Sequence, residues 1–313
     1  MANAKKKTRL SLLATLLSVC LCLASSAATA QTALETPSLS DVSFISPYYF
    51  GPNAFPVPDM VCKVSGDLRV EVAGDYFDGR RGDRVFDISV KANIPLFSRR
   101  VNLSLWIPAI EWYRNTDRNM DVCRVAGKNR KEARRGSMTG DAYVSVDFQA
   151  FEEHDWVPDV VVRAAIKSAS GGGYSLARYY DCPGYFFDVA AAKSFVASRL
   201  HDLRLRLAVT TGFLCWQTGN GRQNDAVQFG AMLGLYARRW SVSQSFGGYA
   251  GWESISCDNP QLAHDRPMVL TTEATYRIKR FELLASYRHG LSDYPYDRFR
   301  IGLAYHIGIV RRR

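Results

Sequence analysis

After residue 30 the sequence has no uninterrupted apolar run that approaches the length of a membrane-spanning helix. Such a helix needs about 20 predominantly apolar residues to cross the hydrocarbon core of a bilayer. The sequence also has no Cys-x-x-Cys spacing of the kind found at structural zinc sites. Its run of three glycines at 171–173 precedes no lysine-bearing helix that could cradle a phosphate. We therefore expect no metal and no cofactor, and we expect any membrane crossing to be made by strands.

Residues 1–30 have the three parts of a secretory signal peptide. Four basic residues between positions 5 and 9 precede an apolar stretch at 10–23, and an Ala-Thr-Ala cleavage site ends at residue 30. The alternative, an uncleaved anchor, fits less well because the apolar stretch is short and ends in small residues. Removal of the four basic residues lowers the formal net charge from +10 to +6. This scattered excess on an exported chain disfavours nucleic acid as a partner.

The rest of the chain alternates apolar and polar residues, most regularly near its end. A period of two places alternate residues on opposite faces of a β-strand. One face of the last such segment holds Phe299, Ile301, Leu303, Tyr305, Ile307 and Ile309. Its other face holds Arg298, Arg300, Gly302, Ala304, His306 and Gly308.

Twelve segments show this alternation, and each is about as long as the 9–11 residues that a tilted strand needs to cross a bilayer. They are 67–78, 84–96, 101–113, 141–151, 157–168, 185–195, 203–216, 225–237, 240–252, 268–278, 281–290 and 298–309. An even number of such strands behind an export signal is typical of outer-membrane proteins. We predict an all-β fold, a closed antiparallel transmembrane β-barrel of about 12 strands over 67–313. The signal peptide (1–30) and a segment rich in proline and aromatic residues (31–66) precede it.

The connections between these strands alternate in length. If the first strand starts on the periplasmic side, the five periplasmic turns are short, whereas the outer connections 114–140, 169–184 and 253–267 are long. Outer-membrane barrels show this asymmetry. The alternative is a soluble β-sandwich or lipocalin-like barrel, which would bury the apolar face, and a lipocalin has eight strands.

Three runs carry a resemblance to known proteins: 45–59 (ISPYYFGPNAFPVPD), 140–146 (GDAYVSV) and 158–171 (PDVVVRAAIKSASG). They resemble outer-membrane β-barrel proteins of Gram-negative bacteria, most of all uncharacterised barrels of the Bacteroidetes group. This resemblance implies a location in the bacterial outer membrane and assembly by the barrel-insertion machinery, and it supplies no catalytic residue. Many such barrels end on an aromatic residue, whereas this chain ends in three arginines.

Charged side chains fall on the polar faces of the predicted strands. A charge that faces lipid is costly near the midplane, so we expect these side chains to line the barrel interior. The candidates are Arg69, Glu71, Asp87, Lys91, Asp147, Asp159, Arg163, Lys167, Asp188, Arg204, Arg206, Glu273, Arg277, Glu282, Arg288, Arg298 and Arg300. Such an interior is either an ion-paired, packed core or a narrow channel. In the channel, a basic ladder of Arg163, Lys167, Arg204 and Arg206 would weakly favour anions.

The segment 41–64 contains four prolines, which exclude a regular helix or a central strand. Its aromatic residues make it unusually apolar for a free tail; they are Tyr48, Tyr49, Phe50 and Phe55. We expect either an inert periplasmic lead-in or a plug that folds back into the barrel.

Two features concern the external loops. Cys123, Cys182, Cys215 and Cys257 lie in or beside them, and an oxidising envelope permits disulfides there. Four cysteines allow three pairings, and free thiols are the alternative. Loop 114–140 carries eight basic and three acidic residues, which predicts either a solvated loop or a surface that binds lipopolysaccharide phosphates.

The function that these features favour is passive passage of small solutes, with outer-membrane lipid and lipopolysaccharide as surroundings. A non-conducting structural or adhesive barrel that acts through its external loops is the alternative. A third hypothesis is a rim hydrolase of the phospholipase type, in which His289 would activate Ser292. No phospholipase motif accompanies these two residues, so we expect the protein not to be an enzyme.

Overall fold

The computed structural model describes residues 57, 60, 62–122, 125, 127–172, 183–198, 202–217, 223–251, 266–292 and 296–308. The expected signal peptide and plug aromatics lie outside these residues. So do three of the four loop cysteines: Cys123, Cys182 and Cys257.

Over the described residues, thirteen strands form one antiparallel sheet. Twelve of them are long, and their bounds agree with the predicted segments to within a few residues. They are β1 (Asp67–Gly79), β2 (Arg84–Pro95), β3 (Val101–Arg114), β5 (Tyr143–Phe151), β6 (Asp159–Lys167), β7 (Gly184–Ser198), β8 (Leu203–Gln217), β9 (Gln223–Tyr236), β10 (Trp240–Gly251), β11 (Met268–Ile278), β12 (Phe281–Ser292) and β13 (Tyr296–Gly308).

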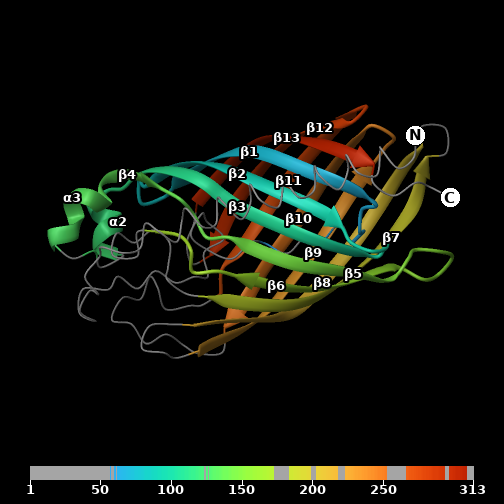
Figure 1. Ribbon diagram of the computed structural model, residues 1–313, viewed down its shortest axis with the longest axis horizontal. Coiled ribbons are helices and arrows are strands. Elements are labelled where there is room, and N and C mark those ends of the chain that lie inside the picture. Colours follow the sequence, from blue (N-terminus) through green and yellow to red (C-terminus); the bar gives the residue numbers. More distant parts are fainter. Residues whose placement is uncertain are drawn as a thin grey trace, which may run out of the picture.

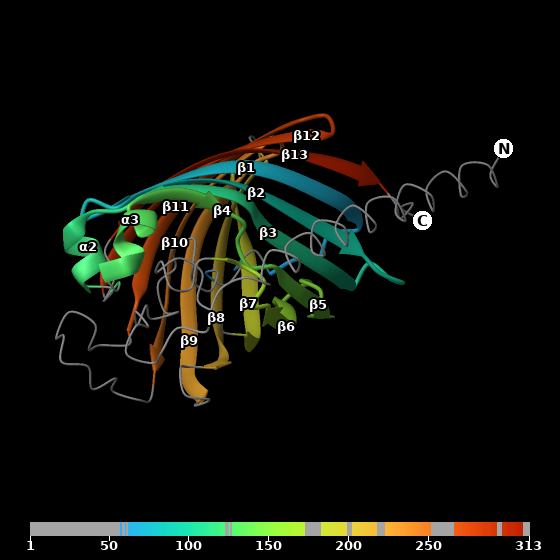
Figure 2. The same cartoon turned by 60° about the vertical axis from the view of Figure 1, so that its left-hand side comes forward.

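The twelve long strands close into a barrel. Each pairs with its neighbours in chain order, and the ring closes where β1 pairs with β13 from Asp67↔Gly308 to Gly79↔Tyr296. Figure 1 shows the long, tilted strands of this barrel, and Figure 2 shows its curved wall from the side. Closure leaves no edge whose backbone groups would be unpaired in hydrocarbon. The predicted twelve-stranded antiparallel barrel is confirmed.

The outer face of the barrel is apolar and exposed. Ile301 on β13, Ile166 on β6 and Val209 on β8 are 75%, 61% and 60% exposed. The inner face carries buried charges such as Glu71 and Asp75 on β1. A water-soluble barrel would reverse this arrangement, because burial of apolar surface stabilises a protein in water. The soluble alternative is therefore wrong, and the apolar outer face is suited to lipid.

The turns at one end of the barrel are short, as predicted. β11 and β12 are joined by Lys279 and Arg280 alone, and Lys279 has a φ of 56°, the left-handed conformation that tight hairpins require. Short turns face the periplasm in outer-membrane barrels. We therefore call this the periplasmic end, and the opposite end the external end.

The connection predicted as one loop at 114–140 contains regular structure. It holds α2 (Asp117–Val122), the 3-10 helix η3 (Gly127–Asn129), α3 (Arg130–Ala133) and β4 (Arg135–Met138). β4 pairs with the last four residues of β3, beyond the part of β3 that pairs with β5. These elements stand at the external end of the barrel (Figure 1). The connection at 114–140 thus contains two short helices, a 3-10 helix and a strand that extends the sheet.

Arginine–carboxylate pairs hold the two short helices together. Arg130 lies 3.0 Å from Asp117 and 2.5 Å from Asp121, and Arg134 lies 2.6 Å from Asp117. Hydrogen bonds from Arg130 and then Arg134 lower the pKa of Asp117 below its ordinary value.

Within the described chain, no helix is long and apolar enough to cross a membrane.

Candidate functional site

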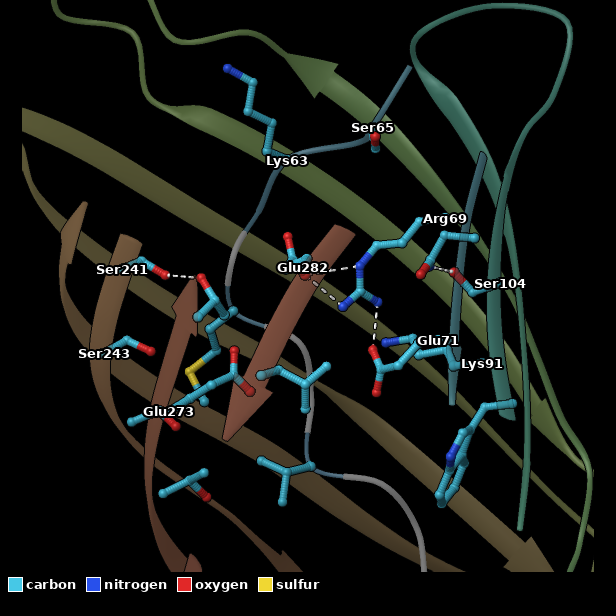
Figure 3. Close-up of a pocket in the computed structure, with 18 of the residues that line it drawn as sticks. Lys63, Ser65, Arg69, Glu71, Lys91, Ser104, Ser241, Ser243, Glu273 and Glu282 are labelled. Carbon is cyan, nitrogen blue, oxygen red and sulfur yellow. Dashed lines mark hydrogen bonds and ion pairs between the residues drawn. The ribbon is translucent and has the colours of Figure 1, made fainter. Parts of the chain in front are cut away.

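The candidate site is a cavity of about 660 Å³ inside the barrel. Ten lysine and arginine side chains and six carboxylates line it, so its walls carry four positive charges in excess if His306 is neutral. Figure 3 shows the cavity, with Ser241, Ser243 and Glu273 on one side and Arg69, Glu71 and Lys91 on the other. Three parts of the wall are distinct: a charged network, a row of hydroxyl groups and an apolar stripe.

The charged network lies on β1, β12 and β13. Arg69 lies 2.5 Å from Glu71 and 2.8 Å from Glu282 on β12. Arg300 on β13 binds both Glu71 and Asp75. The alternation of β1 produces this network, because Arg69, Glu71 and Asp75 are spaced by multiples of two residues and share the inner face. The dashed bonds from Arg69 in Figure 3 belong to this network.

Two lysines of the wall are not neutralised in this way. Lys91 on β2 faces Glu71 across the β1–β2 pair, but the carboxylate of Glu71 binds Arg69 and Arg300 instead. Lys63, just before β1, is exposed. Neither lysine forms an ion pair with another residue that the structure describes. Both charges therefore stay outside ion pairs, although the nearby carboxylate of Glu71 partly offsets that of Lys91.

Hydroxyl groups form the wall on β10 and β11. Ser241, Ser243 and Ser245 alternate along β10, and Thr271 and Thr275 do so along β11. The hydroxyl groups of Ser241 and Thr275 are hydrogen-bonded across the two strands at 2.8 Å. This wall offers uncharged hydrogen-bonding groups to solutes or water.

An apolar stripe runs along the inner face of β6 to β9. Val161, Ala190, Ala192, Ala208 and Met232 form it, and all are buried. Residues that precede β1 cover the stripe. They are Val57, Met60, Cys62 and Val64, which we call the strap.

One hydrogen bond fixes the strap to the wall, and one glycine of the wall makes room for it. The backbone N–H of Val64 donates to Oε1 of Gln149 on β5 at 2.8 Å. A Cβ atom at Gly230 on β9 would lie 2.6 Å from Cε of Met60, so the absence of a side chain there makes room for Met60. The strap belongs to the segment 31–66 that was predicted as a lead-in or plug, and its described residues lie inside the barrel.

The predicted lining residues fall into two groups. Twelve of them border the cavity: Arg69, Glu71, Asp87, Lys91, Asp147, Arg163, Glu273, Arg277, Glu282, Arg288, Arg298 and Arg300. The other five, Asp159, Lys167, Asp188, Arg204 and Arg206, do not border it.

The predicted basic ladder is not an array of available charges. Arg163 lies 2.6 Å from Asp147, Lys167 lies 2.5 Å from Asp141, and Arg206 lies 2.8 Å from Asp159. Arg204, at the periplasmic end, is an exposed residue 3.9 Å from Asp202. Three of these cations are held in ion pairs and the fourth, Arg204, lies outside the cavity lining, so the ladder offers few available charges to a solute.

One of the four predicted loop cysteines, Cys215, lies within the described residues. Cys215 is a buried, free cysteine on β8, in register with Tyr185 on β7 and Asp225 on β9. Cys215 forms no disulfide with a described residue, and its three predicted partners lie outside the described residues, so the loop disulfides remain a prediction.

His289 and Ser292 are not placed as a nucleophile and its base. Nδ1 of His289 lies 2.6 Å from Asp297, and its Nε2 accepts a hydrogen bond from Arg80 at 2.9 Å. The hydroxyl of Ser292 donates to the backbone carbonyl of Arg266. The ring nitrogen that a base would use is already bonded to a cation.

Sequence reasoning missed several cavity residues. The serine row on β10 alternates with Trp240 and Val242, and this pattern was visible in the sequence. Trp106 and Tyr143, whose ring centroids are 4.5 Å apart, also border the cavity. They were missed because only charged residues were taken as markers of the inner face.

No protein-family model and no curated protein matches the sequence. Solved structures do match it. An outer membrane channel from Pseudomonas putida F1 is 10% identical, with 88% of this chain and 99% of that chain covered and a TM-score of 0.52. NanC porin is 12% identical over 75% and 98% of the two chains, with a TM-score of 0.49. LpxR from Salmonella typhimurium is 9% identical over 76% and 99%, with a TM-score of 0.48.

At these identities the likeness concerns the fold alone. The chain has the closed antiparallel barrel of the Pseudomonas putida F1 channel, and it spans nearly the whole of that structure. This fold and the apolar outer face fit an outer-membrane location.

Proposed function

We propose that the protein is a porin-like channel that lets small solutes cross the outer membrane, with a weak preference for anions. The observation that carries the proposal is the charge of the cavity wall, in which ten basic side chains stand against six carboxylates. A ring of like charge along a pore concentrates solutes of the opposite sign. Because much of the wall is ion-paired, the preference is weak.

The same wall supports passage and not only packing. Hydroxyl groups on β10 and β11 face the cavity and can exchange hydrogen bonds with a moving solute. The strap narrows the cavity, since Met60, Cys62 and Val64 border it while they cover the apolar stripe. We therefore propose a narrow channel, and we propose that the strap is the inner end of a plug formed by the segment 31–66.

Conductance of the purified full-length protein in planar lipid bilayers tests this proposal. We expect stepwise insertion of conducting channels. Neighbouring residues on β10 provide a matched pair of variants, because Ser243 borders the cavity and Val242 faces outward. Ser243→Trp should lower the single-channel conductance, and Val242→Trp should leave it unchanged.

Absence of conductance from folded protein would contradict the proposal and favour the non-conducting barrel that acts through its external loops. No observation favours the rim hydrolase. His289 is hydrogen-bonded to Arg80, and the hydroxyl of Ser292 donates to the backbone carbonyl of Arg266.

A further inference from the structure

A row of charged side chains crosses six strands at the external end of the barrel. Directly paired residues form it, in the order His289, Asp297, Asp78, Arg84, Arg114 and Arg135 from β12 to β4. Residues that face each other directly in an antiparallel pair lie on the same face of the sheet. The six side chains therefore share one face of the wall.

That face is the outer one. Two residues from this row toward the periplasm, on the same side of the strands, lies a belt of aromatic side chains: Tyr287, Phe299, Tyr76, Phe86 and Trp112. Phe86 and Trp112 are 43% and 42% exposed and stack with ring centroids 5.8 Å apart. Aromatic belts of outer-membrane barrels lie at the boundary between hydrocarbon and headgroups. The charged row is thus at the height of the lipid headgroups.

The two halves of the row differ in how their charges are balanced. In one half, His289 lies 2.6 Å from Asp297, and the hydroxyl of Tyr287 also donates to Asp297 at 2.6 Å. In the other half three arginines stand side by side, Arg84, Arg114 and Arg135, which we call the arginine row. Arg84 lies 3.3 Å from Asp78, but Arg114 and Arg135 form no ion pair with a described residue.

Two of these three arginines, Arg114 and Arg135, have no anionic partner among the described residues. Directly paired residues have Cβ atoms about 4.5–5.5 Å apart, and like charges in such positions repel and destabilise the sheet. Of the three carboxylates in the neighbouring loop, Asp117 and Asp121 bind Arg130 and Arg134, and Glu132 forms no ion pair with Arg114 or Arg135 among the described residues. Guanidinium groups at this spacing can instead bind the oxygens of a phosphate in a bidentate manner.

We propose that the arginine row binds the phosphorylated headgroup of a glycolipid of the outer leaflet. Arg84, Arg114 and Arg135 contact phosphate oxygens, while the acyl chains of the same lipid lie against Phe86 and Trp112. A phosphorylated glycolipid has anionic groups with an apolar body directly below them. On β2 and β3, an arginine and an aromatic residue two positions apart match these two parts. The lipopolysaccharide contact expected for loop 114–140 is thereby narrowed to Arg114 and Arg135, and Arg84 on β2 is added to it.

Native mass spectrometry of the detergent-solubilised full-length protein tests this site, with bisphosphorylated lipid A as the probe. We expect the variant Arg84→Gln/Arg114→Gln/Arg135→Gln to bind lipid A at least tenfold more weakly than the wild type. The matched control is Arg118→Gln/Lys128→Gln/Lys131→Gln, which removes the same charge from the neighbouring loop and should change binding less than threefold. Heat-modifiable gel mobility shows that each variant forms a folded barrel.

Two further arms identify the source of the phosphate. Lipid A without its phosphates should bind the wild type at least tenfold more weakly, and Trp112→Ala should weaken binding of the phosphorylated lipid. Inorganic phosphate at millimolar concentration should not displace lipid A. Equal binding by the arginine-row variant, an equal loss in the control, equal binding of the dephosphorylated lipid, or displacement by inorganic phosphate would each overturn the proposal.

Discussion

Nζ of Lys167 lies 2.5 Å from Oδ2 of Asp141, and neither side chain is exposed. The pair joins the external end of β6 to the residues that lead into β5. Oδ1 of Asp141 also accepts a hydrogen bond from the backbone N–H of Gly171 at 2.6 Å. One carboxylate thus connects the wall of the barrel to the segments on both sides of the β5–β6 hairpin.

Loss of this carboxylate should destabilise the barrel strongly. Asp141→Asn leaves the buried ammonium of Lys167 without its counter-ion, which costs about 3–5 kcal/mol for buried pairs. Urea unfolding in detergent micelles, followed by tryptophan fluorescence, measures this change. The control is Glu152→Gln, which breaks the exposed Arg100–Glu152 pair and should cost less than about 1 kcal/mol. Equal effects of the two substitutions would show that burial of the Lys167 pair is energetically unimportant.

Release of the strap should widen the channel. Met60→Asp/Val64→Asp places carboxylates against the apolar stripe, and an unpaired buried charge is strongly unfavourable. We expect the strap to leave the wall and the single-channel conductance to rise, with the barrel still folded. Lys63→Arg, which keeps the charge of an exposed strap-side residue, is the control and should conduct like the wild type. An unchanged conductance in the double variant would reject the strap as a constriction.

The helical part of the external loop should loosen in acid. The pKa of Asp117 is lowered by hydrogen bonds from Arg130 and Arg134, so its stabilising contribution is present above the ordinary Asp value of about 3.9. That contribution is lost as the pH falls through the lower folded pKa. Hydrogen exchange of α2 and α3, corrected for intrinsic rates, should show loss of protection below about pH 3.9. Asp117→Asn should lack this protection already at neutral pH; if it keeps the wild-type protection, the arginine contacts do not hold the loop.

Much of the fold follows from the period-two pattern. The segment predicted at 203–216 is β8, Leu203–Gln217, which begins with the alternating run Leu-Arg-Leu-Arg-Leu. β4 could not be predicted, since Arg-Gly-Ser-Met is four residues long and shows no alternation. Its pairing with β3 depends on the fold of the preceding helices.

The site was less predictable than the fold. Alternation assigns Arg69 and Glu282 to polar faces, but it does not reveal that they meet 2.8 Å apart, because strand register and barrel closure join them across 213 positions. The same limit applies to the arginine row, whose members come from three strands. The position of the strap was ambiguous because the prolines of the segment 41–64 exclude regular structure without indicating where that segment packs.

A change of charge at Lys91 should alter selectivity more than the same change outside the barrel. Lys91→Glu replaces a positive charge of the cavity wall by a negative one and should shift the reversal potential toward cation selectivity. Lys131→Glu changes the same charge on the external helix α3 and should produce a smaller shift, because salt screens exposed charges over about 10 Å at 0.1 M ionic strength. Equal shifts would place the selective charge outside the cavity.

The reversal potential of the wild-type channel in a planar bilayer under a tenfold KCl gradient tests the central claim most directly. The positive excess of the cavity wall predicts a potential with the sign for chloride selectivity, and a magnitude well below that of an ideal anion channel. A potential of the opposite sign would contradict the account, because it would show that the carboxylates, and not the lysines and arginines, control the passage of ions.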